Sequence, residues 1–570
     1  MKTITIDNTV YQIENDKNLL EAIRSVNIEL PTFCYNPELS VYGACRMCMV
    51  EVEGRGLVPA CSTSVADGMV VRTNTKKIRD MRKMIVELML AHHDQNCTTC
   101  PKSGSCKLQK LSRDLGVSKV RFKQLECDKT IDTSSASIVR DSSKCILCGD
   151  CVRVCREVQG IGVLEFSNRG SDAKVVAGFN QPMVKTDCVN CGQCIKACPV
   201  GALYPKYQMD SVWDAIYDEE KVVVVQMAPA VRVALGENFG YKPGDATVGQ
   251  MVAALRLLGF DYVYDTSFAA DLTVIEEGNE FLERYKKGER MPQFTSCCPA
   301  WVKFAEQYYP DMIGNLSSCK SPQQMFGSLC KDQLTGMLNI PREKLVVVSI
   351  MPCTAKKFEA KRPELAVDGN PDVDYVITTQ ELAQMIRERG IDYTKLNDAS
   401  FDMPFGYKTG AAVIFGTTGG VSEAVLRYAA SALNGGVVPE VAELRGGEGI
   451  RTMEVPLGDI KLRLAIVSGL ANARRLIEKI RAGEEQYDLV EVMACCGGCV
   501  NGGGQPITEE KQDVADRAKG LYDNDASLQY HSSEQNPYLM EMYEKGLTHE
   551  KAHALLHTVY TDRSAMCDEA

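Results

Sequence analysis

The sequence predicts a multidomain protein of α+β and α/β class, in which several small domains precede one large α/β domain. The chain has 570 residues, which is too long for one ordinary domain. Many of its 25 cysteines gather in short clusters before residue 208. After that point cysteines become sparse, and short β-branched runs alternate with amphipathic segments, as in an α/β domain. We place the domains at residues 1–78, 79–126, 127–208 and 209–570.

The composition of the chain narrows the possible functions. A net charge of −11 without a basic block argues against nucleic-acid binding. We find no apolar run long enough to span a membrane and no signal peptide, so we expect a cytoplasmic protein. In a reducing cytoplasm, cysteines favour metal ligation over disulfides. With only six histidines, thiolate is the main ligand, which is typical of iron–sulfur, zinc or copper(I) sites.

The first domain combines a predicted β-hairpin with a cysteine loop. The segment MKTITIDNTVYQI alternates like a hairpin, and the helical segment LLEAIRSVNI follows it. The loop carries four cysteines in the spacing C-x10-C-x2-C-x12-C, namely Cys34, Cys45, Cys48 and Cys61. This domain resembles the long-loop branch of plant-type ferredoxins, a β-grasp fold that holds one [2Fe–2S] cluster. A zinc site is the alternative.

The second domain begins with an amphipathic segment, IRDMRKMIVELMLAHH, which predicts a helix. Cys97, Cys100 and Cys106 follow it and leave a fourth coordination position for a histidine. A Cys3His zinc site is possible, but the position directly after a [2Fe–2S] domain favours a [4Fe–4S] cluster. We prefer His93 over His92 as the fourth ligand, because the spacing H-x3-C matches related proteins.

The third domain contains two C-x2-C-x2-C-x3-C runs, and the second run ends in proline. This is the pattern of bacterial two-cluster ferredoxins, in which the fourth cysteine of each run binds the other cluster. The pattern predicts one [4Fe–4S] cluster on Cys145, Cys148, Cys151 and Cys198. It predicts a second [4Fe–4S] cluster on Cys188, Cys191, Cys194 and Cys155. Four clusters in so short a stretch favour electron conduction over a purely structural role.

The fourth domain contains several short apolar runs that predict buried strands of a largely parallel sheet. These runs cover residues 222–229, 345–353, 411–420, 464–470 and 488–498. Amphipathic segments such as VGQMVAALRLLG, TQELAQMIRERG and SEAVLRYAASALNGG predict helices between them. Ligands of such sheets gather beyond the carboxyl ends of strands. Two of the predicted strands run directly into cysteine loops, at Cys353 and Cys495.

Three segments of this domain carry a specific resemblance. FTSCCPAW, MPCTAKKFE and EVMACCGGCVNGGGQP resemble the three signature segments of [FeFe]-hydrogenases, in the same order. The whole chain resembles the monomeric clostridial, ferredoxin-linked members. The resemblance implies a two-lobed catalytic domain with an H-cluster, in which a [4Fe–4S] cube is joined to a di-iron unit bearing CO, cyanide and azadithiolate. It implies cube ligands at Cys298, Cys353, Cys495 and Cys499, with Cys499 as the bridge to the di-iron unit.

The resemblance also implies a pocket around the di-iron unit. The ammonium of Lys356 would donate a hydrogen bond to a cyanide, and the alternative is a solvated surface lysine. Pro229 and Ala230 fall where the family places backbone donors to the other cyanide. Four more residues resemble pocket residues, although simple core packing is an alternative for each: Gln323, Met351, Phe415 and Met493.

A proton route is implied separately from the electron route. Cys297 is not needed for the cube, and in relatives this thiol passes protons to the bridging amine; a thiol can do so near neutral pH. The family route continues through Glu277, Ser317 and Glu280 to Arg284. The two glutamates and the arginine share one helix face, at positions i, i+3 and i+7. A solvated stripe of charges is the alternative interpretation.

The function implied by the resemblance is that of a ferredoxin hydrogenase, which interconverts H2 with protons and electrons. We expect ferredoxin or flavodoxin as the electron partner, maturation proteins for the di-iron unit, a monomer, and no dinucleotide site. One alternative is an electron-transfer subunit, which would lack the three catalytic motifs. The other is a hydrogenase-like protein for cluster assembly or sensing, which would lose Cys297 or the lysine motif.

Five cysteines remain outside these sets. Cys127, Cys319 and Cys330 are expected to be small buried residues, and Cys567 to be a free thiol in a polar tail. Cys496 lies between two expected cube ligands, where the family usually has proline. Cysteine adds both an N–H and a thiol that proline lacks. The thiol therefore either points away from the cluster, or it tunes the cube or offers an alternative ligand under oxidising conditions. The glycines of the same loop would allow close approach of the backbone to the cluster.

Overall fold

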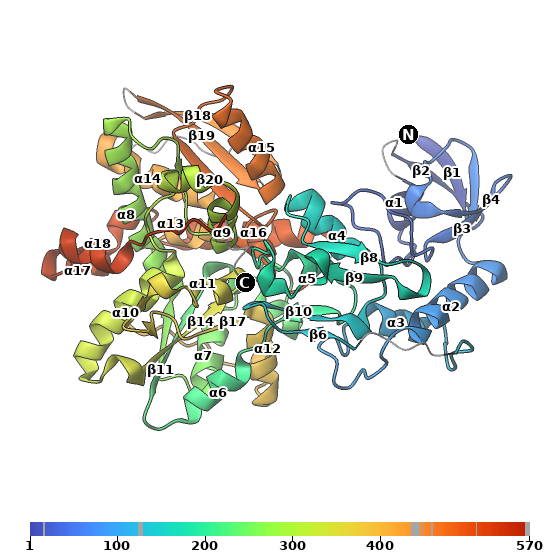
Figure 1. The fold of residues 1–570 in the computed structure, drawn as a ribbon, viewed down its shortest axis with the longest axis horizontal. Helices are drawn as coiled ribbons and strands as arrows, with labels where there is room; N and C mark the ends of the chain where they lie inside the picture. The colour runs from blue at the N-terminus through green and yellow to red at the C-terminus, as the bar shows by residue number, and fades with distance from the viewer. Residues whose placement is uncertain are drawn as a thin grey trace.

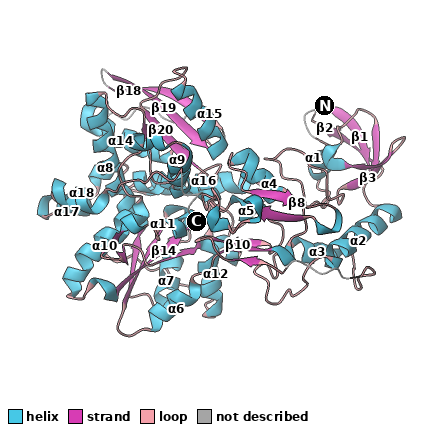
Figure 2. Ribbon diagram, in the orientation of Figure 1, coloured by secondary structure: helices cyan, strands magenta, loops and turns pink. Residues whose placement is uncertain are grey.

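The structure is a computed structural model that describes residues 1–14, 18–123, 129–434, 445–446, 449–457, 460–508 and 510–564. The N-terminal domains extend to one side of a larger body that contains two sheets (Figure 1). Helices cover both of these sheets, whereas the strands of the N-terminal domains are short and are accompanied by the helices α1 to α5 (Figure 2). Cys127, Cys567 and the expected boundary after residue 126 lie outside the described residues.

The N-terminal domain is a five-stranded sheet with one helix. The expected hairpin is present, and β1 also pairs in parallel with β5. The sheet order is β2-β1-β5-β3-β4, with β1 (Lys2–Ile6), β2 (Thr9–Ile13), β3 (Met49–Val52), β4 (Gly56–Pro59) and β5 (Met69–Arg72). Helix α1 (Leu19–Arg24) begins at Asn18, whose side chain accepts a hydrogen bond from the Glu21 amide.

The second and third cysteine regions are held by short elements. Helix α2 (Lys76–Ala91) and helix α3 (Lys107–Asp114) flank the second cysteine group. In the third region, a small sheet and a hairpin support three short helical segments that carry cysteines. These elements are β6 (Ile131–Asp132), β7 (Ile138–Asp141), β10 (Leu203–Pro205), β8 (Leu164–Ser167), β9 (Lys174–Ala177), α4 (Asp150–Arg153), the π-helix η3 (Val154–Val158) and α5 (Gln193–Ala197).

The large domain contains two four-stranded sheets rather than one. The first is entirely parallel, in the order β12-β11-β14-β17, with β11 (Val222–Met227), β12 (Tyr262–Asp265), β14 (Leu345–Met351) and β17 (Tyr375–Thr378). The second has the order β13-β20-β19-β18 and ends in an antiparallel pair, with β13 (Gln293–Phe294), β18 (Ile450–Leu457), β19 (Ile460–Ser468) and β20 (Leu489–Met493). The expectation of largely parallel pairing is therefore right for the first sheet and only partly right for the second.

The strand expected at residues 411–420 is wrong. This segment forms helix α13 (Gly410–Val413) and the 3-10 helix η13 (Ile414–Gly416), and helix α14 (Gly420–Asn434) begins at its end. The run is buried on every side, so it shows no periodicity that would distinguish a helix from a strand. Its small residues allow α13 to pack closely against α8 and α14.

Helix α8 (Thr266–Lys287) is central to the large domain, because it packs against α10, α13 and α14. The remaining large-domain helices cover the sheets: α6 (Met209–Tyr217), α7 (Val248–Leu258), α9 (Pro299–Tyr308), α10 (Pro322–Leu338), α11 (Ala355–Glu359), α12 (Thr379–Glu388) and α15 (Leu470–Arg481). The C-terminal helices return to this region, where α17 contacts α8 and α18 contacts α10. They are α16 (Lys511–Ser527), α17 (Pro537–Lys545) and α18 (His549–Leu556). Among the described helices, none combines the length and apolar character needed to cross a membrane.

Candidate functional site

Three loops bring the four expected cube cysteines together. Cys353 follows strand β14, Cys298 caps helix α9, and Cys495 and Cys499 follow strand β20. Burial, and then the neighbouring thiols Cys353 and Cys298, raise the pKa of the Cys495 thiol. The same causes raise the pKa of the Cys499 thiol. Four neighbouring thiols in the protein interior are poorly suited to carry charge unless a cation compensates it, so this donor set fits a thiolate-ligated metal cluster.

The glycines of the 495–504 loop are required by contacts with other loops. A Cβ on Gly502 would lie 2.1 Å from the Pro352 carbonyl oxygen. A Cβ on Gly498, which has a φ of +89°, would lie 2.6 Å from the Thr418 nitrogen. From the sequence we expected these glycines to let the backbone approach a cluster. In the structure they lie against backbone atoms of other loops, and Gly502 packs the Cys499 loop against the Cys353 loop.

Lys356 is buried, so the alternative of a solvated surface lysine is wrong. Its ammonium donates hydrogen bonds to Glu359, at 2.9 Å, and to the Cys297 carbonyl oxygen, at 3.2 Å. Burial lowers the pKa of Lys356, but Glu359 and then Cys353 outweigh burial and raise it overall, so the ammonium stays charged. The Gln323 amide also donates to Glu359, at 2.9 Å, and its oxygen has no partner among the described residues.

The other expected pocket residues lie in three places. Phe415 and Met493 pack in one apolar cluster with Cys297 and Cys298. Met351, at the end of β14, packs in the core of the first sheet. Pro229 and Ala230 lie in the 3-10 helix η7 (Pro229–Val231), which contacts β14, η13 and the 3-10 helix η15 (Cys499–Asn501).

The expected proton residues lie in sequence from the pocket towards the surface. Burial, and then Glu277, raise the pKa of the Cys297 thiol. Burial, and then Glu280, raise the pKa of Glu277 to about 8. Both Glu277 oxygens are buried without a well-formed hydrogen bond among the described residues, although the Ser317 hydroxyl is close enough to offset part of the shift. A buried carboxyl of this kind excludes the solvated-stripe interpretation for Glu277.

Beyond Glu277 the residues are joined by hydrogen bonds. The Ser317 hydroxyl donates to the Glu280 carboxylate at 2.7 Å. Arg284 donates to Glu280 at 2.6 Å and to the Leu316 carbonyl oxygen at 3.0 Å. The guanidinium is 9% exposed and the Glu280 carboxylate 14% exposed, so the buried series ends near the surface. The structure therefore brings all five expected residues into one series.

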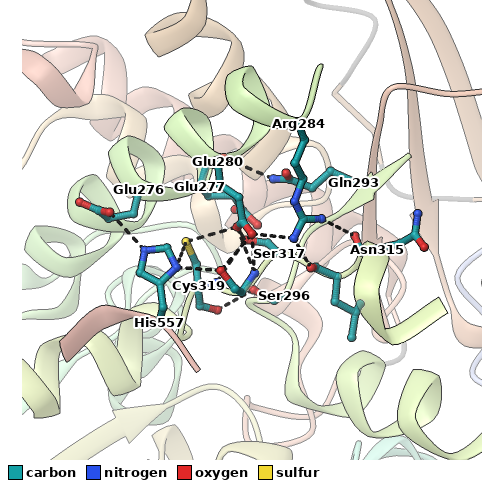
Figure 3. Close-up of polar contacts among 12 residues, drawn as sticks. Glu276, Glu277, Glu280, Arg284, Gln293, Ser296, Asn315, Ser317, Cys319 and His557 are labelled. Carbon is teal, nitrogen blue, oxygen red and sulfur yellow. Dashed lines mark hydrogen bonds and ion pairs between the residues drawn. The ribbon is translucent and has the colours of Figure 1, made fainter. Parts of the chain in front are cut away.

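Sequence reasoning missed several residues around Glu280 (Figure 3). The Ser318 hydroxyl donates to Glu280 at 2.9 Å and lies 2.8 Å from His557 Nδ1. Cys319 is buried as expected, but its sulfur lies 3.9 Å from Glu280 and 4.0 Å from His557. His557 comes from the C-terminal segment, so nothing near Glu280 in the sequence could have indicated it. Glu280, Cys319 and His557 offer metal-ligand atoms within 4.8 Å of one another, but their contacts are accounted for by hydrogen bonds.

The first two N-terminal cysteine groups are each compact. Cys34 and Cys45 have sulfurs 3.3 Å apart, and the Phe33 amide points at Cys45 Sγ at 3.4 Å. The other two thiols of this group also adjoin each other, because Cys61 lowers the pKa of Cys48 to about 7. In the second group, His93 is buried and its Nδ1 has no hydrogen-bond partner among the described residues, which fits a metal ligand.

The other thiols of the second group and both sets of the third also gather as expected. Burial and, among the neighbouring thiols, Cys100 and Cys97 raise the pKa of Cys106. In the third region one cavity of about 30 Å³ is lined by Cys145, Cys148, Cys151 and Cys198. Burial, and then four other thiols, raise the pKa of Cys194; in order of effect these are Cys191, Cys188, Cys155 and Cys198. The fourth cysteine of each run therefore lies with the other run.

Direct contacts join neighbouring cysteine groups. The Arg153 guanidinium donates to the Cys34 carbonyl oxygen at 2.9 Å. A Cβ on Gly201 would lie 2.5 Å from Cys100 Sγ. The Gln193 amide donates to Cys495 Sγ at 3.0 Å, and so joins the third region to the candidate site. The first and second groups therefore each adjoin the third region, and the third region adjoins the candidate site.

Cys496 lies at the seam between the third and fourth regions. Its sulfur is 3.7 Å from the position of a Cβ on Gly469, and the Val158 carbonyl oxygen is 3.1 Å from the same position. The Cys496 carbonyl oxygen accepts a hydrogen bond from Asn501 at 2.9 Å. Val158 belongs to the π-helix that carries Cys155.

Comparisons with known families agree with this geometry. Residues 221–503 match the iron only hydrogenase large subunit, C-terminal domain, and residues 511–563 match the iron hydrogenase small subunit. The N-terminal matches are a 2Fe-2S iron-sulfur cluster binding domain at 1–76, the NADH-ubiquinone oxidoreductase-G iron-sulfur binding region at 82–121 and a 4Fe-4S dicluster domain at 144–202.

Individual relatives cover the whole chain or its large domain. The NADP-reducing hydrogenase subunit HndD of Solidesulfovibrio fructosivorans is 46% identical over 99% of this chain and 100% of its own length. Iron hydrogenase 1 of Clostridium pasteurianum is 39% identical over 98% of this chain and 100% of its own length. The mouse (Mus musculus) cytosolic iron-sulfur assembly component 3 is 32% identical over 66% of this chain and 83% of its own length.

A solved structure gives the same result for the large domain. A variant of the [FeFe]-hydrogenase HydA1 from Chlamydomonas reinhardtii is 41% identical, with a TM-score of 0.56. The match covers 62% of this chain and 98% of that one. With two full-length relatives and the catalytic-domain match in agreement, the chain belongs to the iron-only, or [FeFe], hydrogenase family.

Proposed function

We propose that this chain catalyses the reversible reaction of two protons and two electrons to H2 at an H-cluster in the candidate site. The observation that carries the proposal is the meeting of four motif thiols from three loops, next to the buried ammonium of Lys356 and the additional thiol of Cys297. A bound H-cluster would supply the iron centre at which protons and electrons combine. The chain supplies the ligands, the pocket, and separate routes for protons and electrons.

In this proposal the thiolates of Cys298, Cys353, Cys495 and Cys499 would hold the cube, and Cys499 would also join it to the di-iron unit. Glu359 fixes the Lys356 ammonium, which would be available to donate a hydrogen bond to an anionic ligand of that unit. The backbone at Pro229 and Ala230 would contact the same unit. The remaining pocket residues exclude water and set the shape, and these are Gln323, Met351, Phe415 and Met493.

The proton route runs from Cys297 through Glu277, Ser317 and Glu280 to Arg284. A carboxyl with a pKa near 8 can both accept and release a proton near neutral pH. The Ser317 hydroxyl can pass a proton because it donates to Glu280 and also lies next to Glu277. The buried course keeps water away from the pocket while protons move.

The electron route uses four accessory clusters. We propose a [2Fe–2S] cluster on Cys34, Cys45, Cys48 and Cys61. We propose three [4Fe–4S] clusters, on His93 with Cys97, Cys100 and Cys106, on Cys145, Cys148, Cys151 and Cys198, and on Cys188, Cys191, Cys194 and Cys155. The contacts of Arg153, Gly201 and Gln193 support electron transfer from the first and second clusters through the third region to the candidate site.

Two candidates can be proposed for the electron partner of this chain. We propose ferredoxin or flavodoxin, because the entry domains are themselves ferredoxin-like and the sequence has no dinucleotide motif. The similarity to HndD favours a second candidate, in which this chain is one subunit of an NADP-reducing assembly and another subunit binds NADP. The first candidate is a cytoplasmic monomer served by maturation proteins, and the second is an oligomer.

A role in cluster assembly is disfavoured, although an assembly component is among the relatives. Such a protein has no need of Cys297 next to a buried carboxyl relay or of a buried Lys356. This chain has both features.

The test is to load the purified apo-chain with the di-iron unit and to record infrared bands of bound CO and cyanide together with H2 production. We expect the bands, and H2 production with reduced ferredoxin but not with NADPH. The Cys297→Ala variant should keep the bands and lose turnover. Absence of the bands after loading would refute the hydrogenase proposal. H2 production with NADPH by the chain alone would refute the proposal that it has no dinucleotide site.

A further inference from the structure

A second hydrogen-bonded series leaves Glu280 away from Arg284 (Figure 3). The Ser318 hydroxyl donates to Glu280 Oε1 at 2.9 Å and lies 2.8 Å from His557 Nδ1. On the far side of the imidazole, His557 Nε2 lies 3.2 Å from Glu276 Oε2. Each link joins groups that can donate or accept a proton.

Backbone contacts hold the imidazole in this position. His557 follows helix α18 and forms an isolated β-bridge with Cys319. The Lys320 amide donates to the Leu556 carbonyl oxygen, and the Thr558 amide donates to the Ser318 carbonyl oxygen, both at 2.8 Å. These bonds fix the backbone on both sides of His557. The imidazole is therefore kept near Ser318 by the backbone as well as by its own hydrogen bonds.

The Glu276 end of this series is at least as exposed to solvent as the Arg284 end. The His557 and Glu276 side chains are 10% and 12% exposed, compared with 9% for Arg284. Glu277 and Ser317 are completely buried. Glu280 is thus the point at which a single buried route can continue in two directions.

The chemistry of the two directions differs. A guanidinium stays protonated throughout the physiological pH range, so Arg284 can hold Glu280 but cannot release a proton to water. An imidazole has two ring nitrogens, so one can accept a proton from Ser318 while the other gives one up to Glu276. Of the two groups that adjoin Glu280 at this surface, His557 is the one suited to proton exchange.

We propose that His557 carries protons between Glu280 and solvent, through Ser318 on one side and Glu276 on the other. This inference rests on the proposed hydrogenase function and identifies a second branch of its proton route. It gives Arg284 the role of positioning the Glu280 carboxylate rather than carrying the proton.

The transfer balances as a series of proton shifts without any movement of electrons. Protonated Glu280 gives its proton to the Ser318 oxygen, and the Ser318 hydroxyl gives its own proton to His557 Nδ1. The resulting imidazolium donates Nε2–H to the Glu276 carboxylate and then releases that proton through Glu276 to water. For H2 formation the same shifts run inwards.

The charges around His557 support a transient imidazolium. From α8, Glu276 lies 3.2 Å from His557 Nε2 and Glu280 lies within 4.8 Å of the ring, and Arg284 is hydrogen-bonded to Glu280. The Cys319 thiol lies 4.0 Å from Nδ1, and His553 on α18 stacks on the ring with centroids 4.8 Å apart. The Tyr543 hydroxyl from α17 donates to Glu276 and holds that carboxylate in place. His549 also acts on Glu276 electrostatically.

The test uses the full-length, H-cluster-loaded protein with His557→Gln and the control His531→Gln. His531 is exposed and pairs with Asp525, outside the hydrogen-bonded series. We expect His557→Gln to keep the wild-type infrared bands and to lower H2 turnover on the order of tenfold. Its pH profile should differ from that of the wild type, and added imidazole should restore part of the rate. His531→Gln should stay within about twofold of wild type.

A second variant protects the test against a folding defect of His557→Gln. Ser318→Ala removes the link between Glu280 and His557 without changing α18. We expect the same loss of turnover, but no rescue by imidazole. The reason is that the broken link lies between Glu280 and His557, on the buried side of the imidazole. Wild-type rates and pH profiles in both variants would overturn the branch. A wild-type protein without H2 turnover would instead overturn the proposed function itself, so the two failures are distinguishable.

Discussion

The side-chain amide of Gln193 donates a hydrogen bond to the Cys495 sulfur at 3.0 Å. Gln193 is the first residue of α5, the helix that carries Cys194, so this bond spans the boundary between the ferredoxin-like region and the catalytic domain. The same amide lies 3.4 Å from the Asn501 carbonyl oxygen. One side chain therefore contacts an expected cube ligand and the loop that contains it.

The first prediction concerns this hydrogen bond. A hydrogen bond to a cluster thiolate stabilises the more negative, reduced state and raises the reduction potential. Gln193→Leu should therefore lower the potential of the cube by on the order of tens of millivolts. Spectroelectrochemistry of the loaded protein measures this shift. Gln384→Leu, on the exposed side of α12, serves as the control and should leave the potential unchanged. An unchanged potential in Gln193→Leu would show that the bond does not tune the cube.

The second prediction concerns the pH dependence of turnover through Glu277. Its pKa is raised to about 8 by burial and then by Glu280, so the carboxyl is protonated at neutral pH. H2 formation should decline as the pH rises through about 8, because ionised Glu277 has no proton to give to Cys297. Glu277→Gln should lower turnover on the order of a hundredfold or more at every pH. Turnover measured over a pH range that brackets the Glu277 pKa tests this in both proteins, and a wild-type rate that is flat across that range contradicts it.

The same shift predicts that stability also falls as the pH rises. The folded-state pKa of Glu277 lies above its unfolded value of 4.5. The stability that this group contributes is therefore complete below about pH 4.5 and is lost as the pH rises through about 8. Above that pH the loss is on the order of 5 kcal/mol. Glu277→Gln should therefore melt at a higher temperature than wild type in alkaline buffer, and the difference should shrink at lower pH. Equal melting temperatures in alkaline buffer would refute the shift.

The sequence was enough to predict those parts of the site whose residues lie close together along the chain. The cysteine runs place their thiols within a few residues of one another, and the structure gathers each set as expected. The exchanged fourth cysteines, Cys155 and Cys198, could be predicted because the paired spacing is specific. The 411–420 segment could not, because an apolar run buried on all sides shows no helical or strand period.

The surroundings of Glu280 could not be predicted either. His557 lies 239 positions after Ser318, and only the packing of the C-terminal helices brings them together. Cys319 was expected to be a small buried residue, and its contacts with Glu280 and His557 depend on that same packing. The electron partner also remains a proposal, because the full-length relatives include an NADP-reducing subunit.

The third prediction concerns the packing of the cluster loops. A Cβ on Gly502 would lie 2.1 Å from the Pro352 carbonyl oxygen, and both segments belong to loops that carry cube cysteines. Gly502→Ala should force these loops apart and lower both the melting temperature and the iron content. Gly336→Ala is the control: it lies in the exposed part of α10 with no atom within 4 Å of the added Cβ. That change should stabilise the helix by about 0.5–1 kcal/mol. A Gly502→Ala protein with wild-type iron content would contradict the prediction.

The fourth prediction concerns Cys496, which stands where the family usually has proline. Its sulfur lies beside Gly469, near the Val158 carbonyl oxygen. Proline would remove the thiol and the amide N–H but leave the four cube thiols in the chain. Cys496→Pro should therefore keep H2 turnover within a few-fold of wild type, with the full iron content. Cys496→Ala separates loss of the thiol from the effect of the proline ring, and Cys495→Ala is the control that should lose the cube. If Cys496→Pro and Cys496→Ala both fail to assemble the cluster, the Cys496 thiol is a ligand rather than an optional residue at the domain seam.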